Sequence, residues 1–256
     1  MSVSPTDRGE IVATLRAAGC VFAEEEAALL LDAAPSPAAL AALVDRRVGG
    51  EPLEQILGWV EFCGLRIALA PGVFVPRRRT GLLVGQAVAL ADAGSVVVDL
   101  CCGSGAVGAA LGAALGSVEL HAADVDPVAV GCARRNVAGR VHEGDLYRAL
   151  PRTLLGRVDV LVVNAPYVPT ESIRLMPPEA RLHEPTATLD GGADGLDVQR
   201  RVIADAPRWL APGGSLLIET SEQQAPHTAA AITRCGLTAR VVTSTELDAT
   251  VVVGTR

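Results

Sequence analysis

Residues 95–105 read S-V-V-V-D-L-C-C-G-S-G, and this stretch decides the expected fold. The apolar run over 95–100 is typical of a buried strand. Glycines at 103 and 105 let the backbone turn tightly where the strand ends, and they let a ligand approach the N-terminus of the following helix. A plain tight turn would also account for the glycines. The stretch therefore predicts a strand, a glycine loop and a helix, in that order.

The same alternation continues along the chain. Helices are expected at 106–115, 127–138, about 197–210 and 222–235. Strands are expected at 118–123, 158–163 and 215–219, followed by apolar runs at 239–242 and 250–253. Strands that alternate with helices indicate an α/β protein, with a parallel sheet covered on both faces and ligands at the carboxyl ends of the strands.

The first third of the chain has a different pattern of apolar residues. Residues 5–48 have apolar positions at helical spacing in three segments, and Ser4-Pro5-Thr6 offers a start signal. Residues 51–76 alternate partially about Gly64, which suggests a hairpin. We therefore expect a small helical domain over 1–50, a β-hairpin linker over 51–80 and an α/β domain over 81–256.

Composition narrows the class of protein. Half of the 256 residues are hydrophobic, so the chain can bury a sizeable core. A net charge of −7 argues against broad nucleic-acid binding, which draws on Lys and Arg. Six scattered cysteines form no C-x-x-C pair, so neither a metal site nor a disulfide framework is expected. The N-terminus has no apolar leader and no run suits a membrane span, so we expect a cytoplasmic protein without membrane contact.

Acidic residues follow the glycine loop at the next strand ends. Together with Gly108, the loop reads G-x-G-x-x-G, a pattern shared by NAD-binding and S-adenosylmethionine-binding sheets. Asp124 ends the next expected strand, where a carboxylate can accept both hydroxyls of a ribose. Asp126 precedes Pro127 and is expected to cap a helix. Asp145 can accept from an adenine amino group, or it is a solvated loop carboxylate.

The strand at 158–163 stops at Asn164-Ala165-Pro166-Tyr167. A planar nitrogen is a poor nucleophile because its lone pair is delocalised. Two acceptors that grip its N–H bonds can aim that lone pair at a methyl donor. The Asn164 side-chain oxygen and the carbonyl of Ala165 would supply the acceptors, and Tyr167 a stacking face. The motif therefore favours S-adenosylmethionine over NAD.

At this point the sequence resembles the HemK/PrmC-type protein-(glutamine-N5) methyltransferases, which methylate the glutamine of the Gly-Gly-Gln loop in peptide chain release factors. The resemblance rests on motifs spread over most of the chain. They are E-P-L-E-Q-I-L-G-W-V-E-F-C-G-L (51–65), V-P-R-R-R-T (75–80), D-L-C-C-G-S-G (99–105), N-A-P-Y-V-P (164–169), A-R-L-H-E-P (180–185), L-D-G-G-A-D-G-L (189–196) and L-A-P-G-G-S-L-L-I-E (210–219).

The resemblance implies a seven-stranded, Rossmann-like class I methyltransferase sheet, with a helical substrate-recognition domain joined to it by a β-hairpin. It implies S-adenosyl-L-methionine as cofactor and a protein glutamine as substrate. The cofactor residues carried over are Cys101, Gly103, Ser104, Gly105, Asp124, Asp145, Leu146 and Asn164. The catalytic residues carried over are Asn164, Ala165, Pro166 and Tyr167.

Three departures from the family pattern concern the substrate. Ala165 stands where relatives usually have proline, and Cys101 stands where they have glycine. Arg78-Arg79 and Gly81 replace a Pro-x pair and a glutamate around Thr80, which removes an expected polar partner. These changes leave the reaction type in place and open the question of which protein is methylated.

Two other functions stay open on the sequence. The four-residue motif also suits the N6 amino group of adenine in a nucleic acid, and a module that binds the cofactor without turnover would keep the same fold. Arg77-Arg78-Arg79 suggests an acidic or RNA-associated partner or, more simply, a solvated face. His183 is expected to be structural, and Glu219 is left without a role.

Overall fold

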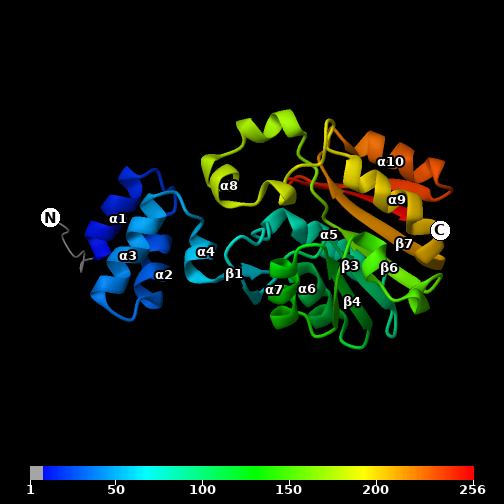
Figure 1. Cartoon of the computed structure of the whole chain (residues 1–256), viewed down its shortest axis with the longest axis horizontal. Helices are drawn as coiled ribbons and strands as arrows, with labels where there is room; N and C mark the ends of the chain where they lie inside the picture. The colour runs from blue at the N-terminus through cyan, green and yellow to red at the C-terminus, as the bar shows by residue number, and fades with distance from the viewer. Residues whose placement is uncertain (1–7) are drawn as a thin grey trace.

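A computed structural model describes residues 8–256, except for the side chains of Pro178 and Ala180. The start signal expected at Ser4–Thr6 lies outside these residues. The centre of the protein is a seven-stranded sheet in the order β5-β4-β3-β6-β7-β9-β8 (Figure 1). Its strands are β3 (Val96–Leu100), β4 (Glu119–Asp124), β5 (Arg140–Glu143), β6 (Val158–Val163), β7 (Leu210–Thr220), β8 (Thr238–Ser244) and β9 (Ala249–Thr255). The α/β class and the seven-stranded sheet are confirmed.

The expectation of a parallel sheet is wrong for one strand. β3 pairs in parallel with β4 and β6, and β6 with β7, whereas β9 runs antiparallel to both β7 and β8. Four residues join β8 to β9, and a tight connection of that length can only reverse the chain. β9 then fits between β7 and β8, so the sheet is mixed.

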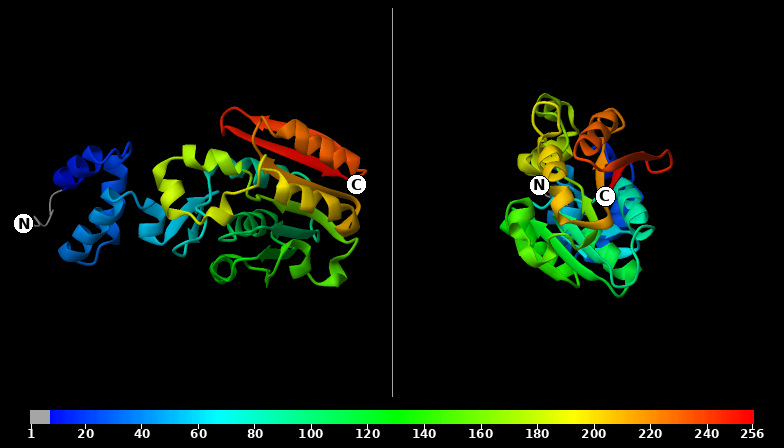
Figure 2. Two further views of the ribbon diagram at one scale, coloured as in Figure 1. Left: turned by 45° about the horizontal axis from the view of Figure 1, so that its top comes forward. Right: turned by 90° about the vertical axis from the view of Figure 1, so that its right-hand side faces the viewer.

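Helices cover both faces of the sheet, as Figure 2 shows in two further views. One face carries α5 (Gly81–Val88), α6 (Ala106–Leu115) and α7 (Pro127–Asn136). The other carries α9 (Asp197–Trp209) and α10 (Ala225–Arg234), together with the 3₁₀ segments η2 (Leu146–Ala149) and η3 (Arg152–Leu154). The central strands are buried on both faces, which is why β3 and β6 read as nearly continuous apolar runs.

The N-terminal helices lie at the far end of the molecule from the C-terminus (Figure 1). They are α1 (Arg8–Ala17), α2 (Ala23–Ala33), α3 (Pro37–Val48) and the short α4 (Leu53–Leu57). Ser36 caps α3 by accepting from the Ala39 N–H, and Pro37 occupies its first turn. These helices share a separate apolar cluster that includes Leu15 and Leu30. The domain boundaries given above stay a prediction.

The expected hairpin consists of β1 (Trp59–Phe62) and β2 (Leu65–Ala68). Cys63 and Gly64 form its two-residue turn, and both have positive φ. The hairpin is fastened to the sheet domain by Asn136 in α7, whose side chain exchanges hydrogen bonds with the backbone of Ala68. Helix α7 therefore holds the hairpin in place against the sheet domain.

The chain between β6 and α9 is irregular. It includes η4 (Thr170–Leu175), α8 (Pro178–His183) and η5 (Thr186–Thr188), and it extends toward the N-terminal helices (Figure 1). Arg47 of α3 reaches it through an ion pair of 3.1 Å with Glu179. Among residues 8–256, no helix is apolar over a length that could cross a bilayer.

Candidate active site

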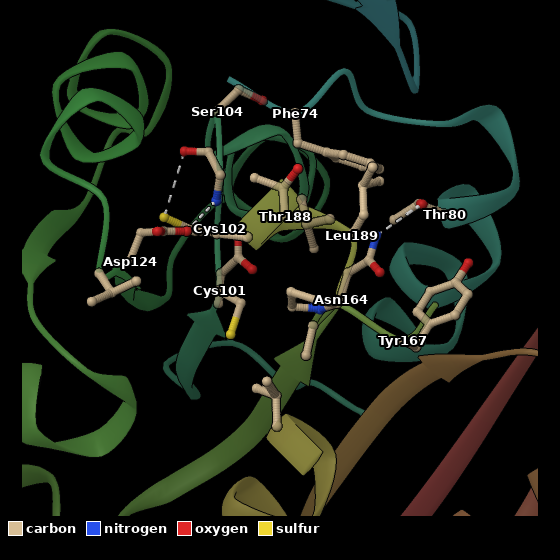
Figure 3. A pocket seen from close by; sticks show the side chains of 18 of the residues that line it. Phe74, Thr80, Cys101, Cys102, Ser104, Asp124, Asn164, Tyr167, Thr188 and Leu189 are labelled. Carbon is tan, nitrogen blue, oxygen red and sulfur yellow. Dashed lines mark hydrogen bonds between the residues drawn. The ribbon is translucent and has the colours of Figure 1, made fainter. Parts of the chain in front are cut away.

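A cavity of about 240 Å³ opens at the carboxyl ends of β3, β4, β5 and β6 (Figure 3). The site residues predicted from sequence come together here from four separate parts of the chain. Those that line the cavity are Cys101, Gly103, Ser104, Asp124, Asp145, Leu146, Asn164, Ala165, Pro166 and Tyr167. This is the edge at which ligands bind in open α/β sheets.

Gly105 is the exception among the predicted cofactor residues. It lies behind the loop, against α7, and does not line the cavity. Its φ is +78°, and an added Cβ would come within 2.6 Å of the Val137 side chain and 3.1 Å of the Ala133 Cα. Gly105 is therefore required for packing of the loop on α7. Gly103 has φ +54° and faces the cavity with nothing within 4 Å of an added Cβ.

Asp99 is a buried member of the site that the sequence reading missed. Its Oδ2 accepts from the Gly108 N–H at 2.8 Å, near the start of α6, and it lines the floor of the cavity. Burial raises the pKa of Asp99 to about 7, against the lowering effect of that hydrogen bond. The only sequence signal is an aspartate in an otherwise apolar strand.

Asp124, the last residue of β4, binds the backbone of the glycine loop that follows β3. Its two oxygens accept from the Gly103 N–H at 2.8 Å and the Asp126 N–H at 3.0 Å. Burial is the largest cause of its raised pKa, and these backbone bonds oppose it. Asp126 caps α7 by accepting from the Val128 N–H, as predicted. Asp124 therefore faces the cavity as a half-buried carboxylate held at both oxygens.

Asp145 is not a free loop carboxylate. Both of its oxygens lie 2.6–2.7 Å from Nη2 of Arg201 in α9, and both residues line the cavity. The two side chains are 37% and 55% exposed, so the pair lies at the rim. The position after β5 is as expected, and the partner from α9 was not foreseen.

The Asn164-Ala165-Pro166-Tyr167 segment begins where β6 ends, near the middle of the sheet. The Asn164 Nδ2 donates to the Thr80 hydroxyl at 3.3 Å, a contact drawn in Figure 3. Ala165 is buried, and the Tyr167 carbonyl accepts from the Gln224 amide at 2.9 Å. The segment is thus fixed from both sides.

Glu219, at the end of β7, lies behind Tyr167. The Tyr167 hydroxyl donates to Glu219 Oε1 at 3.4 Å, and Arg79 Nε lies 3.6 Å from the same oxygen. The Arg79 guanidinium is 5.9 Å from the centre of the Tyr167 ring, a cation–π contact. Burial raises the pKa of Tyr167 to about 12, so its hydroxyl stays protonated.

The basic run at 77–79 is solvated in part: Arg78 and Arg79 are exposed, as the simpler expectation has it, but two of the three arginines also form ion pairs with buried carboxylates. Arg77 binds both oxygens of buried Glu184 at 2.7 and 2.8 Å, and Arg79 pairs with buried Glu219. The departures around Thr80 therefore add a charged side chain to the cavity wall. Arg79 itself lies there, and Arg77 ties the segment after α8 to the cavity wall.

Cys101 has a φ of +61°, a conformation that costs a non-glycine residue about 1–2 kcal/mol. Its side chain lines the cavity. Burial, with smaller contributions from Asp124 and Asp99, raises the pKa of its thiol well above the usual range. The thiol therefore stays protonated and is a weak nucleophile.

Comparison with known proteins agrees with this geometry. The family model of the methyltransferase small domain matches residues 65–192. A methyltransferase structure from Pyrococcus furiosus superposes with a TM-score of 0.57 at 16% identity, covering 75% of this chain and 89% of that one, so it shares the fold. Fold and site together define a methyltransferase of class I.

Curated relatives narrow the class. The release factor glutamine methyltransferase of Geobacter sulfurreducens is 39% identical over 204 residues, which cover 78% of this chain and 71% of the relative. The 4-amino-L-phenylalanine/4-methylamino-L-phenylalanine methyltransferase of Streptomyces pristinaespiralis is 37% identical over 202 residues, 75% of this chain and 68% of that protein. The chain belongs to the release factor glutamine methyltransferase family.

Proposed function

We propose that this protein transfers a methyl group from S-adenosylmethionine to the side-chain amide nitrogen of a glutamine in a protein. The Gly-Gly-Gln loop of a peptide chain release factor is the first candidate substrate. One observation carries the proposal: Asn164 to Tyr167 follow the central strand β6 and face the same cavity as the glycine loop. A proposed binding site for a planar amide nitrogen thus lies beside a proposed binding site for the methyl donor.

The residues present fit S-adenosylmethionine. That molecule carries a sulfonium cation, ribose hydroxyls and an adenine amino group, and each of these is attracted to or donates to a carboxylate. The cavity wall offers Asp99, Asp124 and Asp145, and Gly103 leaves the loop open where a side chain would stand. Cys101, Ser104 and Leu146 complete the proposed binding set. When bound, the cofactor supplies an electrophilic methyl group.

The Asn164 segment would hold the acceptor nitrogen. The Asn164 Oδ1 and the Ala165 carbonyl oxygen would each accept a hydrogen bond from one N–H of a primary amide. The Tyr167 ring would stack against the plane of that amide. Orientation of this kind can account for about 7–11 kcal/mol of a barrier. Because residue 165 contributes a backbone carbonyl, alanine can fill the role of the usual proline.

A second candidate is the amine of a free aromatic amino acid. It is favoured by the similarity to the aminophenylalanine enzyme and by Arg79, a cavity-lining residue that is 44% exposed and could bind a substrate carboxylate. The third possibility, adenine in a nucleic acid, fits poorly with a net charge of −7. The six free cysteines suit a cytoplasmic location.

Labelled cofactor distinguishes these candidates. We would incubate the protein with methyl-labelled S-adenosylmethionine and, separately, a Gly-Gly-Gln release-factor domain, free 4-aminophenylalanine and adenine-containing DNA. We expect label on the release-factor domain, and none after its Gln is changed to Ala. Transfer to the amino acid alone would support the second candidate, and transfer to none of them would contradict the proposal.

A further inference from the structure

Asn136, the last residue of α7, joins two distant parts of the chain through its side-chain amide (Figure 1). Its Oδ1 accepts from the Ala68 N–H at 2.9 Å, and its Nδ2 donates to the Ala68 carbonyl at 2.8 Å. Nδ2 also donates to the Ser104 carbonyl at 2.8 Å, and a longer contact of 3.5 Å to the Cys132 carbonyl stays within α7. One amide therefore binds both the last residue of the β1–β2 hairpin and a residue of the glycine loop.

The Ser104 carbonyl depends on this side chain. Ser104 is 2% exposed, and it lies just before Gly105, whose carbonyl accepts the first hydrogen bond of α6. Among the residues that the structure describes, Asn136 is the only donor to the Ser104 carbonyl. A buried carbonyl without a donor is costly. Loss of the Asn136 amide is therefore expected to shift the loop toward water.

The glycine loop packs on the same end of α7. Ala133 and Val137 are the residues that an added Cβ at Gly105 would meet, at 3.0 and 2.6 Å. On the other side of the loop, Asp124 accepts from the Gly103 N–H at 2.8 Å. The loop is thus held between the end of β4 and the end of α7.

The hydrogen bonds of Asn136 bear on the cavity from outside it. Gly103 and Ser104 line the cavity, whereas Asn136 and Ala68 do not (Figure 3). The peptide bond between residues 104 and 105 is planar and is fixed at both ends, because its N–H donates to the Cys102 carbonyl at 2.7 Å and its carbonyl accepts from Asn136. The course of the loop along the cavity is thereby set by a residue behind it.

We propose that Asn136 is a positioning residue for the cofactor, which holds the glycine loop in its binding conformation and uses the hairpin as its anchor. This rests on the proposed placement of S-adenosylmethionine against that loop. Asn136 itself touches neither cofactor nor substrate. Through this one side chain, the linker to the N-terminal helices supports the cofactor site.

The first test measures cofactor binding and needs no substrate. S-adenosylhomocysteine is the probe, and calorimetry on the full-length protein gives its Kd. If the loop of Asn136→Ala adopts the binding conformation less than about a fifth of the time, the Kd rises at least about fivefold, because the apparent Kd is the intrinsic Kd divided by that fraction. The KM for S-adenosylmethionine should rise alike, while kcat at saturating cofactor stays within about twofold, since bound cofactor restores the loop. An unchanged Kd in folded Asn136→Ala would overturn the inference.

Two further variants separate the loop from a general loss of stability. Asp159 is half-buried like Asn136, and it accepts from the Val96 N–H at 2.7 Å, at the opposite end of the sheet from the cavity. Asp159→Ala should therefore lower the unfolding free energy in urea while the Kd stays within about twofold. A Kd weakened as much as in Asn136→Ala would reduce the effect to destabilisation and contradict the role.

Asn136→Asp distinguishes the two halves of the amide. It keeps an acceptor for the Ala68 N–H and loses both donations from Nδ2. Because the Ser104 carbonyl is then left without its donor, we expect Asn136→Asp to weaken the Kd at least as much as Asn136→Ala. A wild-type Kd in Asn136→Asp would mean that the hairpin bond alone matters, and it would contradict the role.

The second test needs no change at position 136. The chain has only two asparagines, Asn136 and Asn164, so selective ¹⁵N labelling gives two side-chain amide signals, which Asn164→Ala assigns. By linkage, a cofactor that requires the held loop must favour the bond that holds it. We expect saturating S-adenosylhomocysteine to slow solvent exchange of the Asn136 Nδ2 protons at least about fivefold. Unchanged exchange would contradict the inference, even where Asn136→Ala does not fold.

The outcomes separate this inference from the proposed function. If the wild type binds S-adenosylhomocysteine but methylates none of the three candidate substrates, the proposed function fails, and the Kd of Asn136→Ala still tests the inference. If the wild type methylates the release-factor domain and Asn136→Ala binds the probe as the wild type does, only the inference fails. If the wild type does not bind the probe, the cofactor placement and the inference fail together.

Discussion

Replacement of Asn164 by alanine separates the catalytic and structural parts of the site. The change removes the Oδ1 acceptor and the 3.3 Å hydrogen bond to Thr80. Loss of one aligned polar group at a reacting centre typically costs about 10²–10³ in rate. The hydrogen bond to Thr80 is worth about 0.5–1.5 kcal/mol of folding free energy. Asn164→Ala should therefore lower kcat at least about a hundredfold and the unfolding free energy by only about 1 kcal/mol.

Three measurements check this expectation. Label transfer gives kcat, calorimetry gives the cofactor Kd, and denaturant unfolding gives the stability. The carboxylates proposed to hold the cofactor belong to other strands, so we expect its Kd to stay within about threefold, since they keep their charge-assisted bonds. A loss of cofactor affinity as large as the loss of rate would refute the reasoning, because it would make Asn164 a structural support of the whole cavity.

Three further changes probe the cofactor wall and the packing of the glycine loop behind it. Asp124→Asn should weaken the cofactor Kd by about tenfold or more by calorimetry, since it discharges an acceptor worth about 1.5–3 kcal/mol per bond; an unchanged Kd would exclude Asp124 from the site. Gly105→Ala should lower stability by about 2–4 kcal/mol in urea unfolding, because its Cβ would meet Val137 at 2.6 Å, while Gly85→Ala in open space on α5 should not destabilise. The pKa of Asp99 in the folded protein is about 7 and exceeds its value in the unfolded chain. The contribution of Asp99 to the unfolding free energy therefore falls as the pH rises from about 4 to about 7, by up to about 1.4 kcal/mol per pH unit. Asp99→Asn should flatten that slope, and an identical pH dependence in the two proteins would contradict the assignment.

Features set by local chain geometry could be predicted from the sequence. The apolar run over 158–163 matches β6 residue for residue, because a strand buried on both faces is almost entirely apolar, and Asp159 is its one polar residue. Asp126 could be recognised as a helix cap because the proline after it fits only the first turn. The Asn164 segment could be placed at the cavity because the carboxyl ends of parallel strands share one edge.

Features set by contacts between distant parts of the chain could not be predicted. Arg77 and Glu184 are 107 positions apart, and their pairing depends on how the segment after β6 folds back. Arg201 reaches Asp145 across 56 positions, from a helix whose rotation the sequence does not specify. Gly105 matched the cofactor motif, yet its lack of a side chain serves packing on α7, and the spacing alone cannot tell these two uses of glycine apart.

Glu219 shows the same limit within the site. A glutamate that ends a buried strand stands out in the sequence, but its partners Tyr167 and Arg79 lie far from it along the chain. The position of Arg79 beside Glu219 could likewise not be predicted from the sequence, because the two residues belong to distant segments. The surroundings of such a buried carboxyl are known only from the three-dimensional arrangement.

The central claim is that a glutamine side-chain nitrogen receives the methyl group at Asn164. Its most direct test is fragmentation mass spectrometry of a Gly-Gly-Gln release-factor domain after incubation with the protein and S-adenosylmethionine. We predict one added methyl group on the amide nitrogen of that glutamine, absent when Asn164→Ala replaces the wild type. A methyl group found on any other residue, or an equal yield from Asn164→Ala, would contradict the account.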